Sequence, residues 1–340
     1  NNADVHCLNH DLGGIVGYAT RDMRFLNCVN NGKVHGNGQY TGGILGQLTF
    51  IDENTSGSVS FDNCTNNGDV TGWDSVGGIM GDDQTGEFTA NRCVNTGNVH
   101  AGDCYAGGLV GFTSYSPFII MNCMNSGDIS AGKRVAAGIV GYSNIQGGVK
   151  QILNCANYGS INAPKEQGGI LTTSYEMPDE KAVNCFGEAR LIDVINCYND
   201  GEMPFNHNSG AIVAGAGLGT FINCVCSGRR TVKDGNATVY DDDNYNLSVV
   251  RQMNIYICDH RSESVGWTYW WMSPATGRAE IDFDSTEIPE YSGSGTESDP
   301  YVIGKTSDLR YLELQLAQGL KKNVDGKYFL LKKDRHISCS

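Results

Sequence analysis

A short sequence pattern recurs along the first two thirds of the chain at intervals of about thirty residues, and the fold must accommodate this repeat. The first element of the pattern is a glycine pair, two aliphatic residues and, in most copies, a third glycine. The glycines that mark successive copies are Gly14, Gly43, Gly78, Gly108, Gly138, Gly169 and Gly210. The intervals between them are 29, 35, 30, 30, 31 and 41 residues, which indicates one unit interrupted by loop insertions.

A second element follows each copy of the first and reads Asn-Cys-x-Asn-x-Gly, with Arg92 in place of the first asparagine in one copy. Its cysteines are Cys28, Cys64, Cys93, Cys123, Cys155, Cys197 and Cys224. A short segment such as residues 69–71 or 98–100 comes next, and its composition is typical of a β-strand. Each unit therefore contains two or three strands of three to five residues, separated by Asn and Gly turns.

Such units are too small to bury a core alone, so neighbouring units must stack. No unit contains a helix-length segment with apolar residues three and four apart, which excludes leucine-rich, ankyrin and helical repeats. A propeller blade is the alternative, but it needs about forty residues and four strands. The spacing predicts an all-β fold, a parallel β-helix or β-solenoid with coils of about 30 residues, and right-handed as parallel crossovers usually are.

Stacked coils place equivalent residues about 4.8 Å apart, so seven coils would span about 34 Å. We expect the aliphatic residues to form internal ladders, and the asparagines to satisfy corner backbone groups and tolerate left-handed geometry. The seven repeat cysteines should form a structural ladder of buried free thiols, because in-register parallel strands fit disulfide torsions poorly. The non-repeat cysteines are freer to form disulfides: Cys7, Cys104, Cys226, Cys258 and Cys339.

The composition restricts the partners. A formal charge of −14 and a pI near 4.8 argue against binding to nucleic acid or to anionic lipid, since both need clustered Lys and Arg. No apolar run is long enough to insert into a membrane, and the first residues do not resemble a signal peptide. The 45 glycines accompany 40% hydrophobic residues, which favours folded turns over disorder.

Residues Gly108-Leu109-Val110-Gly111 match the motif for which GLUG-repeat proteins are named, and the Asn-Cys-x-Asn-x-Gly element is similar to their second signature. The resemblance covers roughly residues 10–230. Residues 293–303 resemble the opening of a further β-helix in the same bacterial surface proteins. The resemblance implies a secreted or cell-surface location in a bacterium, since such repeats are found in adhesins and in noncatalytic regions of IgA-cleaving zinc metallopeptidases. The sequence has no His-Glu-x-x-His, so peptidase chemistry does not follow.

We predict solenoid repeats over residues 1–229, an irregular β-rich terminating segment over 230–290, and a cap or the start of a following β-helix over 291–340. An amphipathic helix is expected from Thr306 to Gln318, ending at Gly319 and covering an open solenoid end. The chain reads as a segment of a larger protein. If its ends are uncapped, copies of the chain would associate head to tail.

Candidate site residues have structural alternatives. The aromatic stretch Trp267, Tyr269, Trp270 and Trp271 could bind a glycan or pack in a core. The acidic residues Asp241, Asp242 and Asp243 are weak calcium candidates, because the EF-hand register is missing. No other metal site and no cofactor are expected, since the chain has no Cys-x-x-Cys.

A polar surface row is expected at Asp69, Asn98, Asp128 and Ser160. His35, His100, His207 and His260 have no nucleophile or metal partner in sequence.

These observations predict a noncatalytic extracellular module for adhesion, ligand display or spacing, whose partner would be a host or microbial surface glycan or protein. The alternatives are a self-assembling filament subunit and a β-helical carbohydrate-active enzyme. Carboxylates or Arg and Lys converging in a groove would favour the enzyme. A uniformly polar row would favour the binding module.

Overall fold

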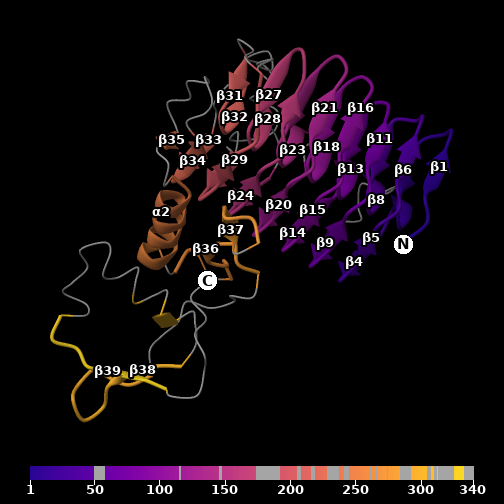
Figure 1. The fold of residues 1–340 in the computed structure, drawn as a ribbon. Helices are drawn as coiled ribbons and strands as arrows, with labels where there is room; N and C mark the ends of the chain where they lie inside the picture. Colours follow the sequence, from indigo (N-terminus) through magenta and orange to yellow (C-terminus); the bar gives the residue numbers. More distant parts are fainter. Residues whose placement is uncertain are drawn as a thin grey trace. The chain divides into compact units, whose positions relative to one another are not determined.

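The structure is a computed structural model that describes residues 1–49, 58–114, 116–144, 148–173, 192–204, 208–215, 219–227, 237–240, 245–260, 262–264, 266–273, 275–283, 292–304, 308–309, 312 and 325–332. The chain forms two compact units, Asn1–Tyr245 and Asn246–Ser340. The first unit is a parallel β-solenoid, which confirms the predicted fold class (Figure 1).

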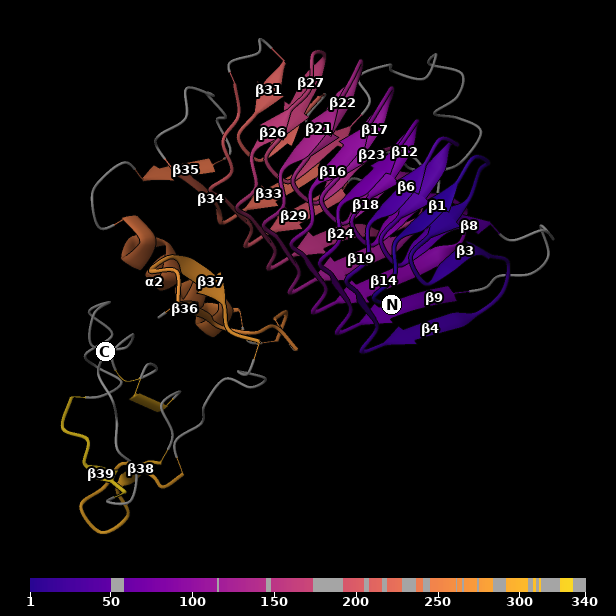
Figure 2. The same ribbon diagram turned by 45° about the vertical axis from the view of Figure 1, so that its right-hand side comes forward.

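Each complete coil contributes one strand to each of five parallel sheets (Figure 2). The third coil, for example, contains β11 (Val70–Gly72), β12 (Ser75–Gly77), β13 (Met80–Thr85), β14 (Glu87–Asn91) and β15 (Val94–Asn95). The prediction of two or three strands per unit was therefore wrong. A strand of two or three residues between corners of one or two residues is too short to show an alternation of apolar and polar residues. The sequence pattern therefore does not distinguish it from a turn.

The remaining strands of sheets 1 to 3 occupy equivalent places in the other coils. Sheet 1 also contains β1 (Val5–Cys7), β6 (Val34–Gly36), β16 (Val99–Ala101), β21 (Ile129–Ala131) and β26 (Ile161–Asn162). Sheet 2 also contains β2 (Leu12–Gly13), β7 (Tyr40–Gly42), β17 (Tyr105–Gly107), β22 (Val135–Ala137), β27 (Glu166–Gly168) and β31 (Ser209–Gly210). Sheet 3 also contains β3 (Val16–Ala19), β8 (Leu45–Thr49), β18 (Val110–Thr113), β23 (Val140–Ser143), β28 (Leu171–Thr173) and β32 (Val213–Ala214).

Sheets 4 and 5 complete the coil. Sheet 4 also contains β4 (Met23–Leu26), β9 (Ser58–Asp62), β19 (Phe118–Met121), β24 (Lys150–Leu153), β29 (Ile192–Ile195) and β33 (Gly219–Ile222). Sheet 5 also contains β5 (Val29–Asn30), β10 (Thr65–Asn66), β20 (Met124–Asn125), β25 (Ala156–Asn157), β30 (Tyr198–Asn199), β34 (Cys224–Ser227) and β35 (Ala237–Tyr240).

Equivalent repeat positions stack in register. Gly77 pairs with Gly42 on one side and with Gly107 on the other. In the last copy Gly210 pairs with Gly168, so the position of the second glycine is taken there by Ala211 rather than by Gly210. Sequence spacing alone aligned this copy one residue out of register.

The interior is divided into two apolar clusters. The larger cluster contains buried residues of sheets 3 and 4 and of the corner between sheets 4 and 5, such as Leu45, Phe61 and Cys64. The smaller contains residues of sheets 1 and 2, such as Val70 and Val76. Phenylalanines stack along the solenoid in the larger cluster, with ring centroids 4.9 Å apart for Phe25 and Phe61 and 5.3 Å for Phe88 and Phe118.

A buried asparagine ladder packs against the second glycine of each copy. A Cβ atom on Gly78 would lie 2.3 Å from Cγ of Asn95 and 2.2 Å from the carbonyl oxygen of Gly108. The amide nitrogen of Asn95 donates to the carbonyl of Gly97 at 2.8 Å and to Oδ1 of Asn125 in the next coil at 2.7 Å. The glycine is thus required for close approach, and the ladder satisfies a corner carbonyl in each of the first five coils.

The first asparagine of the second element has a different role. Asn27, Asn63, Asn122, Asn154, Asn196, Asn223 and, in one coil, Arg92 have φ between 52° and 57°, the left-handed region. Asparagine tolerates this conformation better than most residues. The expectation that the repeat asparagines hold the corners is confirmed at both positions.

The second unit contains helix α2 (Tyr245–Asp259), which begins at the boundary, an antiparallel pair β36 (Trp270–Met272) and β37 (Ala279–Ile281), and a parallel pair β38 (Tyr301–Ile303) and β39 (Phe329–Leu331). Asn254 fixes α2 to β36 through two 2.8 Å hydrogen bonds with the backbone of Trp270. The sequence analysis did not predict α2. The helix expected at 306–318 falls largely outside the described residues.

Candidate binding surface between two sheets

The predicted aromatic candidates lie mostly in the interior of the second unit. Trp267, Tyr269 and Trp270 are buried, and Trp271 is partly exposed. The ring of Trp267 stacks on Tyr256 of α2 with centroids 6.1 Å apart. The three buried residues therefore do not form an exposed aromatic platform. The weak calcium candidates Asp241, Asp242 and Asp243 lie outside the described residues, as does His207.

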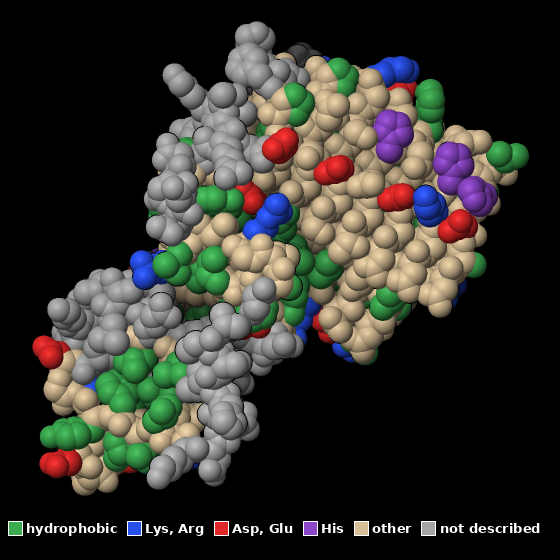
Figure 3. All heavy atoms as spheres, in the orientation of Figure 1, with side chains coloured by type: hydrophobic (Ala, Val, Ile, Leu, Met, Phe, Trp, Pro, Cys, Tyr) green, Lys and Arg blue, Asp and Glu red, His purple; other side chains and the backbone are tan. Residues whose placement is uncertain are grey.

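The predicted polar row lies on the surface and is hydrogen-bonded along the solenoid axis. Oδ1 of Asp69 accepts from the backbone nitrogen of Asn98 at 3.1 Å, and Asn98 accepts in the same way from Asp128 at 3.0 Å. Asp128 accepts from the backbone nitrogen of Ser160 at 2.9 Å. Each side chain thus ties one coil to the next, and Figure 3 shows that charged side chains are sparse on the solenoid face in view.

The histidines that the structure describes do not form a metal group. His35 pairs with His6 across β1 and β6, with ring centroids 5.7 Å apart, and Nδ1 of His100 lies 2.8 Å from Oγ of Ser130. In the second unit Nδ1 of His260 lies 3.0 Å from the carbonyl oxygen of Tyr256. Within the described ranges, no three His, Cys, Asp or Glu residues are arranged to hold a metal ion.

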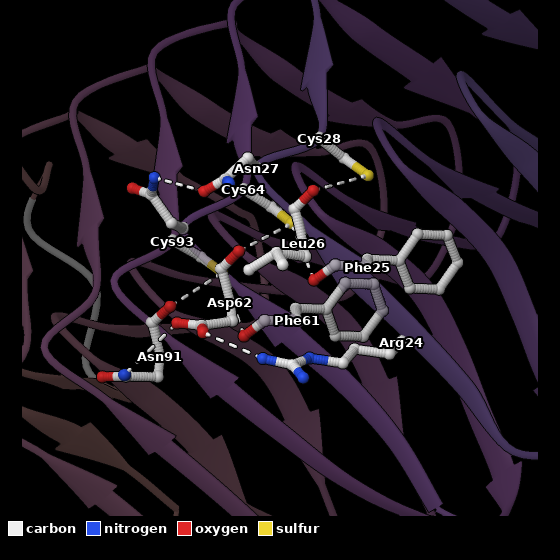
Figure 4. Close-up of polar contacts among 11 residues, drawn as sticks. Arg24, Phe25, Leu26, Asn27, Cys28, Phe61, Asp62, Cys64, Asn91 and Cys93 are labelled. Carbon is white, nitrogen blue, oxygen red and sulfur yellow. Dashed lines mark hydrogen bonds and ion pairs between the residues drawn. The ribbon is translucent and has the colours of Figure 1, made fainter.

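The seven repeat cysteines occupy one column. Six of them are buried and Cys28, in the first coil, is partly exposed. The thiol of Cys64 donates to the carbonyl oxygen of Phe25 at 3.4 Å, and that of Cys93 donates to Phe61 at 3.6 Å (Figure 4). All eleven cysteines that the structure describes are free thiols. Burial is the largest cause that raises the pKa of the thiols at Cys93 and in the two following coils, so those thiols stay protonated.

Sheets 2 and 3 approach each other backbone to backbone at the third glycine of the repeat. A Cβ atom on Gly81 or on Gly111 would lie 2.6 Å from the backbone nitrogen of Thr41 or of Val76, respectively. Beside this contact lies one row of side chains that belong to neither apolar cluster, and we call this row the seam. Sheet 2 contributes Tyr40, Ser75, Tyr105, Val135 and Glu166, and sheet 3 contributes Tyr18, Gln47, Asp82, Phe112 and Tyr142.

Asp82 is the buried carboxylate of the seam, with 0% of its surface exposed. Its Oδ2 accepts hydrogen bonds from the amide nitrogens of Gln84 at 2.6 Å and Gln47 at 3.5 Å, whereas its Oδ1 has no hydrogen-bond partner. Burial raises the pKa of Asp82 to about 7, the two amide hydrogen bonds oppose this change, and the charges of Asp74 and Asp11 add to it.

Two further carboxylates interact electrostatically with Asp82. Asp11 and Asp74 each have a buried Oδ1 without a hydrogen-bond partner. The hydroxyl of Tyr40 lies in the field of all three carboxylates, whose charges add to burial in raising its pKa. Buried acceptors that lack donors carry a desolvation cost of roughly 1–3 kcal/mol each. Three such oxygens in one region concentrate this cost at the seam.

An aromatic group adjoins the acidic one. The ring of Tyr105 lies 5.2 Å from Phe112 and 4.9 Å from Tyr142, and these last two stack 5.6 Å apart. Arg134 donates from Nη1 to the hydroxyl of Tyr105 at 3.3 Å. The two groups are continuous, because Asp82 of β13 pairs with Phe112 of β18.

The sequence analysis did not identify the seam, although the signal was visible beside the motif. Tyr40 and Tyr105 each precede the glycine pair by two residues, whereas Asp82 and Phe112 directly follow the third glycine. The motif by itself indicates only core residues and not their outward neighbours. The outward residues differ from coil to coil, so they are not part of the repeat.

A second ionisable pair lies inside the solenoid. Lys150, fully buried, donates from Nζ to the carbonyl oxygen of Ser114 at 2.6 Å and to that of Asn144. Burial lowers the pKa of Lys150 to about 8, and the charge of Asp83 opposes this change. Burial also raises the pKa of Asp83, which is itself fully buried. Because both side chains are enclosed, this pair is structural rather than a surface for a ligand.

The architecture defines the class of protein as a parallel β-solenoid, and comparison with known families refines it. The GLUG motif matches residues 102–130, which comprise parts of the fourth and fifth coils, so the chain is a β-solenoid that contains a GLUG motif. Neither a curated protein nor a solved structure matched the chain. GLUG motifs occur in surface proteins, and GLUG repeat modules are typically noncatalytic. Over the described residues, none of the helices is long and apolar enough to cross a membrane.

Proposed function

We propose that this chain is a noncatalytic module of the bacterial cell surface or extracellular space that displays or spaces binding surfaces for adhesion. The observation that carries this proposal is the in-register stacking of five parallel sheets, which arranges outward side chains in rows along the solenoid. A row that extends over several coils can contact an extended polymer at several points. The GLUG motif supports a surface location.

The test is adhesion of coated beads. Beads carrying the whole chain are passed over surfaces coated with host cells, bacterial cells, glycans or matrix proteins, and retention under flow is compared with albumin-coated beads. Retention on at least one surface, competed by soluble chain, is the expected result. Retention no better than albumin on every surface would overturn the proposal.

A β-helical carbohydrate-active enzyme is the second candidate, because Asp11, Asp74 and Asp82 converge at the seam. A carboxyl with a pKa near 7, such as Asp82, is suited to general acid catalysis. Polysaccharides incubated with the chain would then release reducing ends or unsaturated products, and Asp82→Asn would abolish the release. We favour the binding module, since GLUG repeat modules are typically noncatalytic.

A further inference from the structure

Three asparagines of the sequence are followed directly by glycine: Asn31, Asn37 and Asn67. An asparagine in this setting can lose its side-chain amide without an enzyme, because glycine has no Cβ atom to hinder the approach of its backbone nitrogen to the neighbouring side chain. All three asparagines are exposed, so exposure does not distinguish them. Their hydrogen bonds do distinguish them, and they predict different chemical stabilities for the three sites.

Asn31 and Asn67 belong to a ladder of polar side chains on the surface of the solenoid. The amide nitrogen of Asn31 donates to Oδ1 of Asn2 at 2.7 Å, and that of Asn67 donates to Oδ1 of Asn31 at 2.7 Å. Oδ1 of Asn67 accepts from the hydroxyl of Thr96 at 2.9 Å. Each of the two side chains thus uses both its nitrogen and its oxygen in bonds to neighbouring coils. Turning either side chain towards the glycine that follows it would break these bonds.

Asn37 lies in the corner between β6 and β7 and has a different environment. Its backbone nitrogen donates to the carbonyl oxygen of Cys7 at 3.1 Å. Among the described residues its side-chain amide has no hydrogen-bond partner, and neither has the backbone nitrogen of Gly38. The corner consists of residues 37–39, whereas the same corner of the next coil, between β11 and β12, is one residue shorter. The stack therefore tolerates different backbone paths at this corner.

We propose that Asn37 is a site of spontaneous deamidation, and that the surface ladder protects Asn31 and Asn67 from the same reaction. The backbone nitrogen of Gly38 attacks Cγ of Asn37 and gives up its proton. The new N–Cγ bond forms, the Cγ–Nδ2 bond breaks, and ammonia leaves. Water then opens the cyclic imide at either of its carbonyls, which yields aspartate or isoaspartate.

The modification changes the surface of the second coil and lies outside the proposed adhesive role. Either product places a negative charge at an exposed corner that carries a neutral amide in the fresh protein. The carbonyl oxygen of Gly38 accepts from the backbone nitrogen of Trp73 at 3.1 Å. An isoaspartate lengthens the main chain next to this contact, so the reaction alters both the charge and the local geometry as the protein ages.

The experiment follows the three sites in one sample. Full chain, either folded or unfolded in guanidinium chloride, is incubated at the same mildly alkaline pH and temperature. Peptide mapping by mass spectrometry then measures deamidation at each asparagine over time, and the unfolded chain supplies the intrinsic rate of each site. We expect the folded-to-unfolded rate ratio of Asn37 to exceed those of Asn31 and Asn67 at least about tenfold, since only the latter two must first break ladder bonds.

Two variants test the parts of the proposal separately. Asn31→Ala removes the acceptor of the Asn67 amide, so Asn67 should deamidate at least about threefold faster in the folded chain. Asn37→Ser removes the reacting side chain and should abolish the earliest acidic shift in isoelectric focusing. Circular dichroism checks that each variant is folded.

The outcomes are decisive without the variants, because the rate ratios are measured on the unchanged chain. A ratio for Asn37 that does not exceed the ratios for Asn31 and Asn67 would overturn the proposal. An unchanged rate at Asn67 in folded Asn31→Ala would overturn the protective role of the ladder. Neither result bears on the adhesive function, since bead retention is measured on freshly purified chain.

Discussion

One residue type performs two separate tasks in each coil. The first asparagine of the second element adopts the left-handed backbone conformation and donates to the preceding coil, whereas the second donates to the following coil and to a corner carbonyl. The two positions are three residues apart, and they are identical in the sequence pattern. Their difference is one of environment, and it determines how much each side chain contributes to stability.

Replacement of Asn66 by alanine should destabilise the solenoid strongly. Its amide donates to Gly68 at 2.8 Å and to Asn95 at 2.7 Å, and its oxygen accepts from Asn30 at 2.8 Å. Loss of these buried hydrogen bonds should lower the free energy of unfolding by about 2–4 kcal/mol. The adjacent Asn67→Ala is the matched control, since Asn67 is exposed, and it should cost about 0.5 kcal/mol. Equal losses in urea denaturation would contradict the ladder's role.

Asp82 makes stability depend on pH. Its pKa is about 7 in the folded protein against an ordinary 3.8, so the folded state binds the proton more tightly. Its contribution to stability is therefore complete below pH 4 and is lost as the pH rises through 7, by up to roughly 4 kcal/mol. Asp82→Asn should match the wild type near pH 4 and exceed its stability near pH 8. Urea denaturation at both values tests this, and a pH-independent difference would contradict it.

At the scale of the element, the corner between sheets 2 and 3 depends on backbone packing. The glycine pair and the third glycine leave no side chain between neighbouring backbones, and the strands can therefore fold back sharply. The aliphatic residues between these glycines point into the larger apolar cluster. The corner thus places core residues on one of its sides and the seam on the other.

The two glycines of the pair should respond differently to substitution. A Cβ atom on Gly108 would lie 2.0 Å from the carbonyl oxygen of Gly138 and 2.6 Å from Cγ of Asn125. Gly108→Ala should cost about 3 kcal/mol or prevent folding. A Cβ atom on Gly107 would lie 1.8 Å from the carbonyl oxygen of Val110. Because Ala137 occupies the equivalent position in the next coil, the backbone can adjust there to accept a methyl group, and Gly107→Ala should cost less than Gly108→Ala. Thermal unfolding of both variants tests this, and a reversed order would show that the backbone contact is not limiting.

The cysteine column predicts a pattern of thiol reactivity. Cys28 is partly exposed at the first coil, whereas Cys64, one coil further on, is buried. The reactive form is the thiolate, and burial disfavours it. In native protein an Ellman reagent should modify Cys28 at least about a hundredfold faster than Cys64. Mass spectrometry after timed quenching locates the modified sites, and similar rates would contradict the enclosed column.

At the scale of the whole molecule, the solenoid is a linear series of coils that interact mainly with their neighbours. Its stability should be roughly a sum of coil and interface contributions. An added or removed coil should preserve the fold, provided that the register of the five sheets is kept. The repeat length of thirty residues in the central coils defines the unit that can be exchanged.

Deletion of residues 98–127 removes one such unit and joins Gly97 to Asp128, which occupies the same position as Asn98. The shortened protein should keep the β-sheet circular dichroism signal, with its urea m-value reduced by about one coil in seven. Deletion of residues 98–112, half a unit, breaks the register and should prevent cooperative unfolding. Cooperative unfolding of the half-unit variant would contradict a register-dependent stack.

The solenoid could be predicted from the repeat because the motif residues of every coil pack in the core. Gly108 and Cys123, for example, are fixed by packing that recurs in each coil. The seam could not be predicted in the same way, since Asp82 and Phe112 occupy one column yet have opposite chemistry. Their proximity to Tyr105 arises from the fold-back of two sheets, a tertiary property. Helix α2 lies outside the repeat, so the periodicity did not indicate it, although Val249, Met253 and Ile257 show four-residue spacing.

The asparagine ladders have a consequence for long-range electrostatics. In the inner ladder each amide donates towards the C-terminal coil, as Asn66 does to Asn95, whereas in the outer ladder each donates towards the N-terminal coil, as Asn196 does to Asn154. The side-chain dipoles of the two ladders point in opposite directions along the axis, so their long-range electric fields oppose each other. An α-helix gains a macrodipole from its aligned peptide groups. This architecture can lengthen coil by coil without a matching build-up of amide polarity at its ends.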